Sequence, residues 1–125
     1  MKTIIHTKDA PKAIGPYSQA VIHNGLIYCS GQIALDPATM EITGDDAAAQ
    51  TEQVMQNLEA VLTAAGSSFS NVLKCTIYLA DMADFKQVNE VYGRRFEKNP
   101  PARETVAVKT LPKEVKVEIS CIAIG

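Results

Sequence analysis

An arginine and a glutamate in the C-terminal part of the chain are the residue types that bind a small organic acid and move a proton. Arg103 follows two consecutive prolines in the segment NPPARETVAV, residues 99–108. Its planar guanidinium can hold a carboxylate through two hydrogen bonds at any working pH. Glu118 lies in the next apolar segment, where a partly dry environment would let it accept and return a proton. The residues alone leave open that the two simply pair with each other or with solvent, as exposed ions on strands often do.

Two further polar residues could complete such a site. Asn89 lies four residues after Phe85 and three before Tyr92, so helical geometry puts its amide on an apolar face. The alternative is a capping or core amide whose hydrogen bonds are already satisfied. Tyr17 lies in the Gly-Pro loop AIGPYSQA, where it would present a phenol to a cleft or pack on a neighbour.

The histidines and cysteines are predicted to be inert. His6 and His23 are isolated from each other and from any acidic pattern, so we expect no catalytic or metal-binding role for them. The three cysteines, Cys29, Cys75 and Cys121, lie in separate apolar runs without a CxxC pattern. They are interpreted as reduced core residues, with no metal site and no disulfide.

Composition narrows the class of protein. The 125 residues are 46% hydrophobic and 21% charged, which is typical of one compact domain spanning 1–125. A net charge of -2 without a Lys/Arg run argues against nucleic-acid or membrane-surface partners. The chain also lacks the roughly 18 apolar residues of a membrane span and a hydrophobic signal core. A soluble, cytoplasmic protein is expected.

Turn and stop signals divide the chain into short elements. Asn24-Gly25 favours a tight hairpin because both residues accept positive φ. Asp45 or Asp46 is a candidate N-cap and Gly66 a stop for one helix. Strands are expected at 19–23, 26–32, 71–80, 104–108 and 115–124, and helices at 46–65 and 82–97.

This order of elements predicts an α+β fold with a mixed β-sheet. A strand-helix-strand unit gives a parallel pair and hairpins give antiparallel pairs, while two helices can cover only one face of the sheet. Alternation assigns the helix-covered face to Ile27, Cys29, Ile33, Leu73, Cys75, Ile77, Leu79, Val106, Val108, Val117, Ile119 and Cys121. It assigns the other face to Tyr28, Ser30, Gln32, Lys74, Thr76, Tyr78, Arg103, Thr105, Lys116, Glu118 and Ser120. Arg103 and Glu118 are therefore expected on one uncovered, half-polar face that packs against another subunit.

Five segments together resemble the RidA family, also called YjgF, of enamine and imine deaminases: IGPYSQAV, IYCSGQIALDP, NVLKCTIYLADMADFKQVNEVY, PPARETVAV and LPKEVKVEI. The similarity runs over essentially the whole chain, and its motifs are specific in combination although each alone is weak. It implies a chorismate-mutase-like domain that forms a homotrimer with a central barrel and with sites between subunits.

The resemblance also implies an activity. Arg103 would grip the carboxylate of a 2-imino or enamino acid such as 2-aminoacrylate, and Glu118 would position or activate water. The products would be a 2-oxo acid and ammonia, with no metal or organic cofactor. A non-catalytic binder of 2-oxo acids would need Arg103 but not Glu118. A ribonuclease or translation inhibitor, also attributed to some members, fits poorly with the charge of -2.

The same resemblance assigns further substrate-binding residues. Tyr17, the backbone around Ser30 and Gly31, and Asn89 would complete the cleft. Thr105 stands where many members have a cysteine, so it keeps a hydroxyl near the ligand but has no thiol chemistry.

Overall fold

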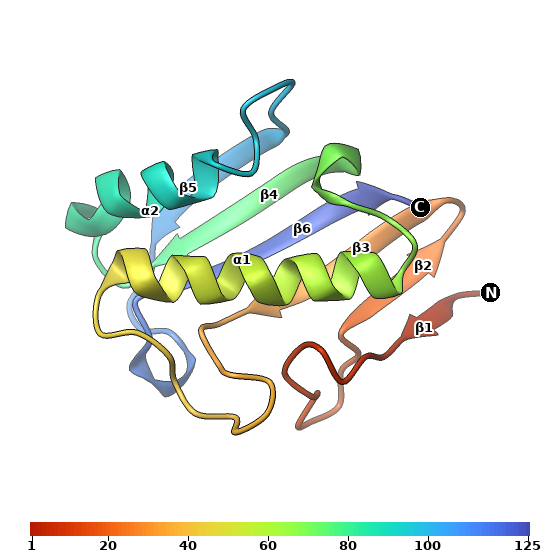
Figure 1. The fold of residues 1–125 in the computed structure, drawn as a ribbon, viewed down its shortest axis with the longest axis horizontal. Coiled ribbons are helices and arrows are strands. Elements are labelled where there is room, and N and C mark those ends of the chain that lie inside the picture. The colour runs from red at the N-terminus through yellow and green to blue at the C-terminus, as the bar shows by residue number, and fades with distance from the viewer.

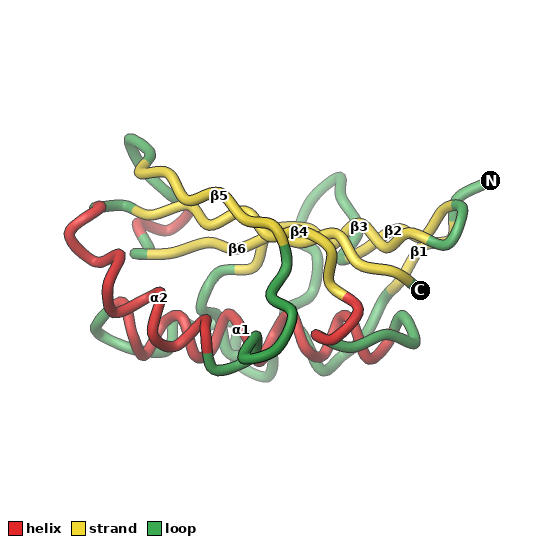
Figure 2. Tube along the Cα trace, turned by 90° about the horizontal axis from the view of Figure 1, so that it is seen from above, coloured by secondary structure: helices red, strands yellow, loops and turns green.

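A computed structural model describes residues 1–125 as a six-stranded sheet with two helices packed on one face (Figures 1 and 2). The predicted α+β fold is therefore confirmed. Neither helix is long and apolar enough to cross a bilayer. The strands are β1 (Thr3–Ile5), β2 (Ala20–His23), β3 (Leu26–Gln32), β4 (Val72–Leu79), β5 (Ala102–Ala107) and β6 (Val117–Ile124), and the helices are α1 (Ala47–Ala64) and α2 (Phe85–Gly93).

The strand order is β1-β2-β3-β6-β4-β5. Only β4 and β5 pair in parallel, and α2 connects them; every other neighbouring pair is antiparallel. This is the expected mixture of hairpins and one strand-helix-strand unit. As a result β5, which carries Arg103, is an edge strand.

The predicted helix cap, helix stop and hairpin turn form at the residues expected from the sequence. Asp46 is the N-cap of α1, and its Oδ1 accepts a hydrogen bond of 2.7 Å from Ala49 N. Gly66 follows the helix with φ of 77°, a conformation that favours glycine. Asn24 and Gly25 have φ of 51° and 77°, as a tight hairpin between β2 and β3 requires.

Two elements differ from the prediction. The helix expected at 82–97 is a 3₁₀ turn at Met82–Asp84 followed by α2, which ends at Gly93. Residues 94–96 continue only in i to i+3 hydrogen bonds, a tighter turn than an α-helix. A strand ahead of the hairpin is expected from the order of elements, but no residue range is predicted for it, because the three exposed edge residues of β1 carry too little pattern.

The core fills the space between the helices and the sheet. The prediction that the three cysteines are core residues is confirmed, since all three side chains are buried. They lie side by side across the sheet, with Cys121 on β6 opposite both Cys29 on β3 and Cys75 on β4.

Alternation assigns the faces correctly along β6 but fails along β5 and at two register shifts. Leu73, predicted in the core, is 44% exposed, because the β4–β6 register shifts between Val72 and Lys74. Gln32, predicted on the uncovered face, is only 5% exposed, because the β3–β6 register shifts after Cys29. One shifted residue reverses the faces of all residues beyond it.

Candidate functional site

Arg103 lies on the helix-covered face of the sheet. It stands opposite the buried Cys75 in the β4–β5 ladder, and residues in register share a face. Its guanidinium carbon is 5.6 Å from the centre of the Phe85 ring and 5.2 Å from that of the Tyr92 ring, both on α2. The prediction that Arg103 and Glu118 share one face is therefore wrong for a single chain.

Asn89 holds this guanidinium from the same helix. Arg103 Nη1 donates a hydrogen bond of 2.6 Å to Asn89 Oδ1, and the spacing of Phe85, Asn89 and Tyr92 puts all three on one face of α2. Arg103 makes no ion pair. The ion pairs of the chain are Lys74–Glu104, Arg94–Glu90 and Arg95–Glu52. Its remaining donors are free to bind an anion in a cleft of about 390 Å³. That cleft is lined by Asn89, Tyr92, Gly93, Phe96, Pro100, Pro101 and Arg103.

Two buried hydroxyls belong to this region. Thr105 stands opposite Ile77 and so faces the helices, contrary to its predicted face. Thr105 Oγ1 and Tyr92 Oη are buried without a hydrogen bond of good geometry. Burial, together with the neighbouring Cys75 thiol, raises the pKa of Tyr92, so its phenol stays protonated. The aromatic stack on Arg103 was missed in the sequence, where Phe85 and Tyr92 were read only as an apolar helix face.

Glu118 lies on the opposite, uncovered face. It stands across from Tyr78 on β4, between the buried Val117 and Ile119. Its side chain is half-buried and has neither a hydrogen bond nor an ion pair. Burial raises the pKa of this carboxyl above its ordinary value of 4.5, because water no longer fully solvates the charge. A carboxylate of this kind is a stronger proton acceptor than one in water.

The end of β3 and the loop before β2 enclose Glu118. A Cβ on Gly31 would lie 2.9 Å from the Glu118 carboxyl carbon and would collide with Oε2, so only glycine lets the carboxylate lie there. The Ser30 hydroxyl donates a hydrogen bond of 2.5 Å to the Ser18 carbonyl, which ties β3 to the loop that carries Tyr17. Tyr17, Ser30, Gly31 and Glu118 all line one cleft of about 450 Å³.

The end of β3 and three loops supply the rest of this cleft, and although part of them lies in the motifs IYCSGQIALDP and LPKEVKVEI, nothing in the sequence indicated that these segments meet. They approach one another only in the fold, so alternation and spacing could not find them. The additional lining residues are Pro11, Lys12, Ile14, Gln32, Ile33, Leu35, Met40, Pro112 and Lys113.

The predicted site residues thus form two groups within one chain. Asn89, Thr105 and Arg103 lie on the helix-covered face, with the arginine cleft beside them. Tyr17, Ser30, Gly31 and Glu118 line the glutamate cleft on the other side of the sheet. Strand β4 separates β5 from β6, so a single copy does not bring the two groups together.

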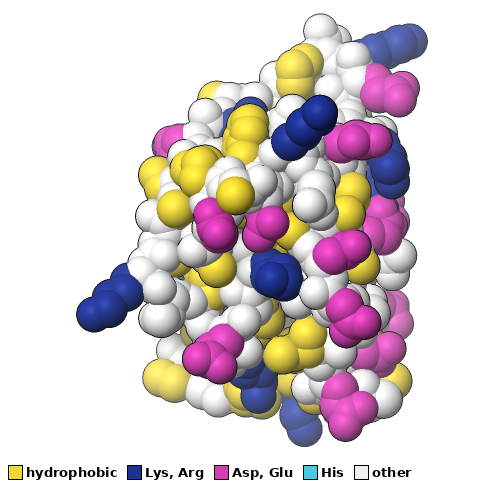
Figure 3. All heavy atoms as spheres, turned by 90° about the vertical axis from the view of Figure 1, so that its left-hand side faces the viewer, with side chains coloured by type: hydrophobic (Ala, Val, Ile, Leu, Met, Phe, Trp, Pro, Cys, Tyr) yellow, Lys and Arg dark blue, Asp and Glu magenta, His cyan; other side chains and the backbone are white.

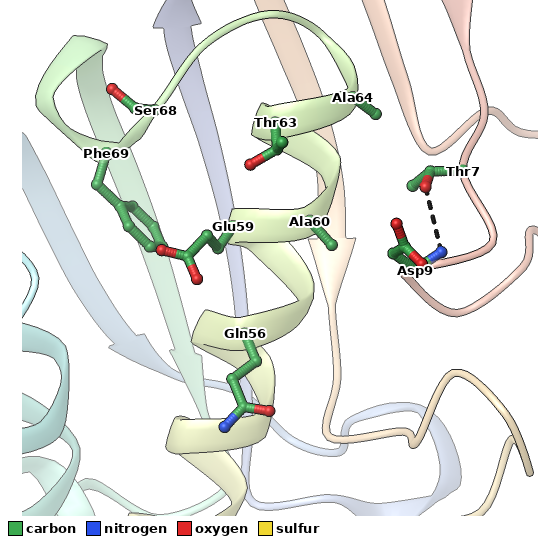
Figure 4. A pocket seen from close by; sticks show the side chains of 9 residues that line it. All are labelled: Thr7, Asp9, Gln56, Glu59, Ala60, Thr63, Ala64, Ser68 and Phe69. Carbon is green, nitrogen blue, oxygen red and sulfur yellow. Dashed lines mark hydrogen bonds between the residues drawn. The ribbon is translucent and has the colours of Figure 1, made fainter.

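A third hollow, of about 400 Å³, lies between α1 and the loop after β1 (Figure 4). Its charged lining residues are Asp9 and Glu59, with no cation, so it does not suit an anionic small molecule. Elsewhere no three His, Cys, Asp or Glu side chains gather into a group that could hold a metal ion.

Comparisons with known proteins agree with this architecture. The model of the family described as Endoribonuclease L-PSP, which is the YjgF or RidA family, matches residues 7–125. The chain belongs to the RidA family. Among curated RidA relatives, protein DfrA of Myxococcus xanthus is 59% identical over 97% of this chain and 94% of its own length.

Two other relatives carry names or ligands that bear on activity. The human protein named 2-iminobutanoate/2-iminopropanoate deaminase is 44% identical over 99% of this chain and 90% of its own length. The crystal structure of E. coli TdcF with bound serine superposes with a TM-score of 0.93 at 40% identity, covering 98% of each chain. The RidA fold is thus shared along the whole chain.

Proposed function

We propose that this RidA protein hydrolyses reactive 2-imino and enamino acids, such as 2-iminobutanoate and 2-iminopropanoate, to 2-oxo acids and ammonia. One observation carries the proposal: the fold holds an arginine and a glutamate in clefts without giving either an ionic partner. The name of the human relative and the serine bound to TdcF support a small amino-acid-like ligand.

The complete site would form between copies of the chain. Arg103 is on the edge strand β5, from which it can reach a neighbour, while the glutamate cleft opens on the uncovered face. That face also exposes Tyr28, Val106 and Ile124, which are 46%, 43% and 45% exposed. Exposed apolar side chains on a sheet face that no helix covers favour contact with another subunit. A homotrimer around a central barrel would place the arginine cleft of one copy against the glutamate cleft of the next.

The reaction needs one group that binds the substrate carboxylate and another that transfers a proton. Arg103, held by Asn89, would bind the substrate carboxylate and so orient the imine carbon toward Glu118. The Glu118 carboxylate would take a proton from a water molecule as the water oxygen bonds to the imine carbon. Glu118 would then return that proton to the imine nitrogen. The hydroxyl proton of the carbinolamine then passes to the nitrogen, the C–N bond breaks to release ammonia, and the C=O bond forms. One water is consumed, and no electrons are exchanged.

A coupled assay tests this proposal. A threonine or serine dehydratase generates the imine, and release of the 2-oxo acid is followed with and without the protein. We expect Arg103→Ala to lose about ten- to a hundredfold in kcat/KM, as for lost hydrogen bonds to a charged group. Glu118→Gln should lose about a hundredfold or more. Arg94 and Glu90 form an exposed ion pair outside both clefts, and the single variants Arg94→Ala and Glu90→Gln serve as the matched controls. Unchanged imine decay with wild-type protein would contradict the proposal.

Two other activities fit the observations less well. A non-catalytic binder of 2-oxo acids would use Arg103 but leaves the half-buried Glu118 without a role. A ribonuclease, which the family description suggests, would need a basic surface for RNA. The chain carries a net charge of -2, and the face at the α2 end interleaves acidic and basic side chains without a continuous basic strip (Figure 3).

A further inference from the structure

Two lysines line the glutamate cleft, and the proposed reaction gives them no task. Lys12 comes from the loop between β1 and β2, and Lys113 from the loop between β5 and β6. Neither is among the residues that form ion pairs. In particular, neither ammonium lies within ion-pair distance of Glu118. The cleft therefore has a carboxylate at one place and unpaired positive charge at another.

The backbone that carries Lys113 is unusual for its residues. Lys113 has φ of 55° and ψ of 21°, and Glu114 follows with φ of 56°. Such left-handed conformations are unfavourable for a non-glycine residue, because Cβ comes close to the backbone oxygen. The neighbouring Leu111 and Val115 are buried, and Glu114 N donates a hydrogen bond of 3.0 Å to Leu111 O. The anchored turn keeps Lys113 at the cleft in spite of this cost, and strain of this kind gathers at ligand sites.

The remaining lining suits the carbon chain of a ligand. Ile14, Ile33, Leu35 and Met40 make much of the wall apolar. The cleft of a single copy has a volume of about 450 Å³. A substrate whose side chain is only a methyl or ethyl group would leave both lysines without an anion.

We propose that the glutamate cleft selects 2-imino acids whose side chain ends in a second carboxylate, which Lys12 and Lys113 bind. This inference rests on the proposed deaminase function and names its substrate class. Methylene groups of the ligand would lie on the apolar wall, and the distal carboxylate would neutralise the two ammonium groups. The 2-oxodicarboxylate product has the same distal group and is a stable probe of the same contacts.

Calorimetry with two stable 2-oxo acids tests the lysines without catalysis. The probes are 2-oxoglutarate and 5-methyl-2-oxohexanoate, in which two methyl groups replace the distal carboxylate oxygens. We expect wild-type protein to bind 2-oxoglutarate at least about tenfold more tightly, as for one or more hydrogen bonds to a charged group. The preference should shrink in Lys12→Met and Lys113→Met, vanish in the double variant and weaken with added salt. Lys2→Met, which removes the same charge outside the cleft, should keep it.

Kinetics with the corresponding imines, made in situ by an amino-acid oxidase, separates this inference from the proposed function. If the protein accelerates hydrolysis of aliphatic imines but shows no preference for the acidic one, the lysine subsite is refuted and the deaminase function stands. The subsite is refuted as well if the preference survives in the folded double variant. If neither imine is hydrolysed faster and neither 2-oxo acid binds, both proposals fail.

Discussion

Two inactive variants should restore each other's activity if the site lies between copies of the chain. Arg103 is held against α2 on one face of the sheet, and Glu118 lines a cleft on the other. A copy with Arg103→Ala keeps an intact glutamate cleft, and a copy with Glu118→Gln keeps an intact arginine cleft. Co-expression in one cell, with a different affinity tag on each variant, would give mixed oligomers. Tandem purification and native mass spectrometry would verify their composition.

The size of the recovery follows from counting sites. In a random equal mixture, half of the copies supply Arg103 and half supply Glu118. A site that takes one residue from each of two neighbours is complete in about one quarter of cases, whatever the number of copies in the ring. The mixture before tandem purification should therefore show about a quarter of wild-type kcat in the coupled imine assay, while each variant alone stays near background.

A second mixture distinguishes the two geometries. Wild type mixed equally with the double variant Arg103→Ala, Glu118→Gln should keep about one quarter of the activity if sites are shared. It should keep about one half if each chain holds its own site. A site shared between copies is refuted if the single variants fail to restore each other's activity in verified hybrids while the second mixture retains about half of the wild-type activity.

Three further outcomes follow from individual contacts. Burial raises the pKa of Glu118 above the ordinary carboxyl pKa of 4.5. As the pH is lowered, kcat/KM should therefore begin to fall while the pH is still above 4.5. A pH dependence that follows only the protein-free hydrolysis would contradict the role of Glu118 as base. Gly31→Ala should abolish activity but leave cooperative unfolding intact, because the new methyl group collides with the end of one flexible side chain; a fully active variant would show that Glu118 works from another position. Arg95 donates hydrogen bonds of 2.6 Å and 2.7 Å to both oxygens of Glu52, and Arg95→Ala should cost about 1 kcal/mol of unfolding free energy, a small value because Glu52 is partly exposed and screened. Arg95 lowers the pKa of Glu52 from 4.5 to about 2, so this contribution is complete above pH 4.5 and is lost as the pH falls toward 2. Urea denaturation of both proteins at several pH values would measure it, and a pH-independent difference would rule out this ion pair as the cause.

The local elements of this protein could be read from its sequence because their causes are local. Asp46 caps α1 with its own side chain, and Asn24-Gly25 makes the hairpin because both residues have positive φ. The repeated apolar spacing of α1 places its buried face without knowledge of the partner. The order of elements was enough to predict an α+β fold with one parallel pair, and the motif combination was enough to indicate the RidA family.

The faces of β5 could not be read in the same way. Most of its residues are exposed, because it is an edge strand with a neighbour on one side only. Alternation predicts Val106 in the core, but the residue stands opposite Tyr78 and is 43% exposed. The true faces depend on the register with β4, which the crossover through α2 sets.

Sequence alone therefore determined which residues could do chemistry here, and the tertiary structure decided how they are grouped. A residue type and a helix or strand period are properties of a short segment. The face that a strand turns to the core depends on long-range pairing, and one shifted residue reverses it. For this reason Arg103 and Glu118 were recognised from the sequence. Their separation by the sheet, the aromatic stack on Arg103 and the two lysines that line the Glu118 cleft appeared only in the folded chain.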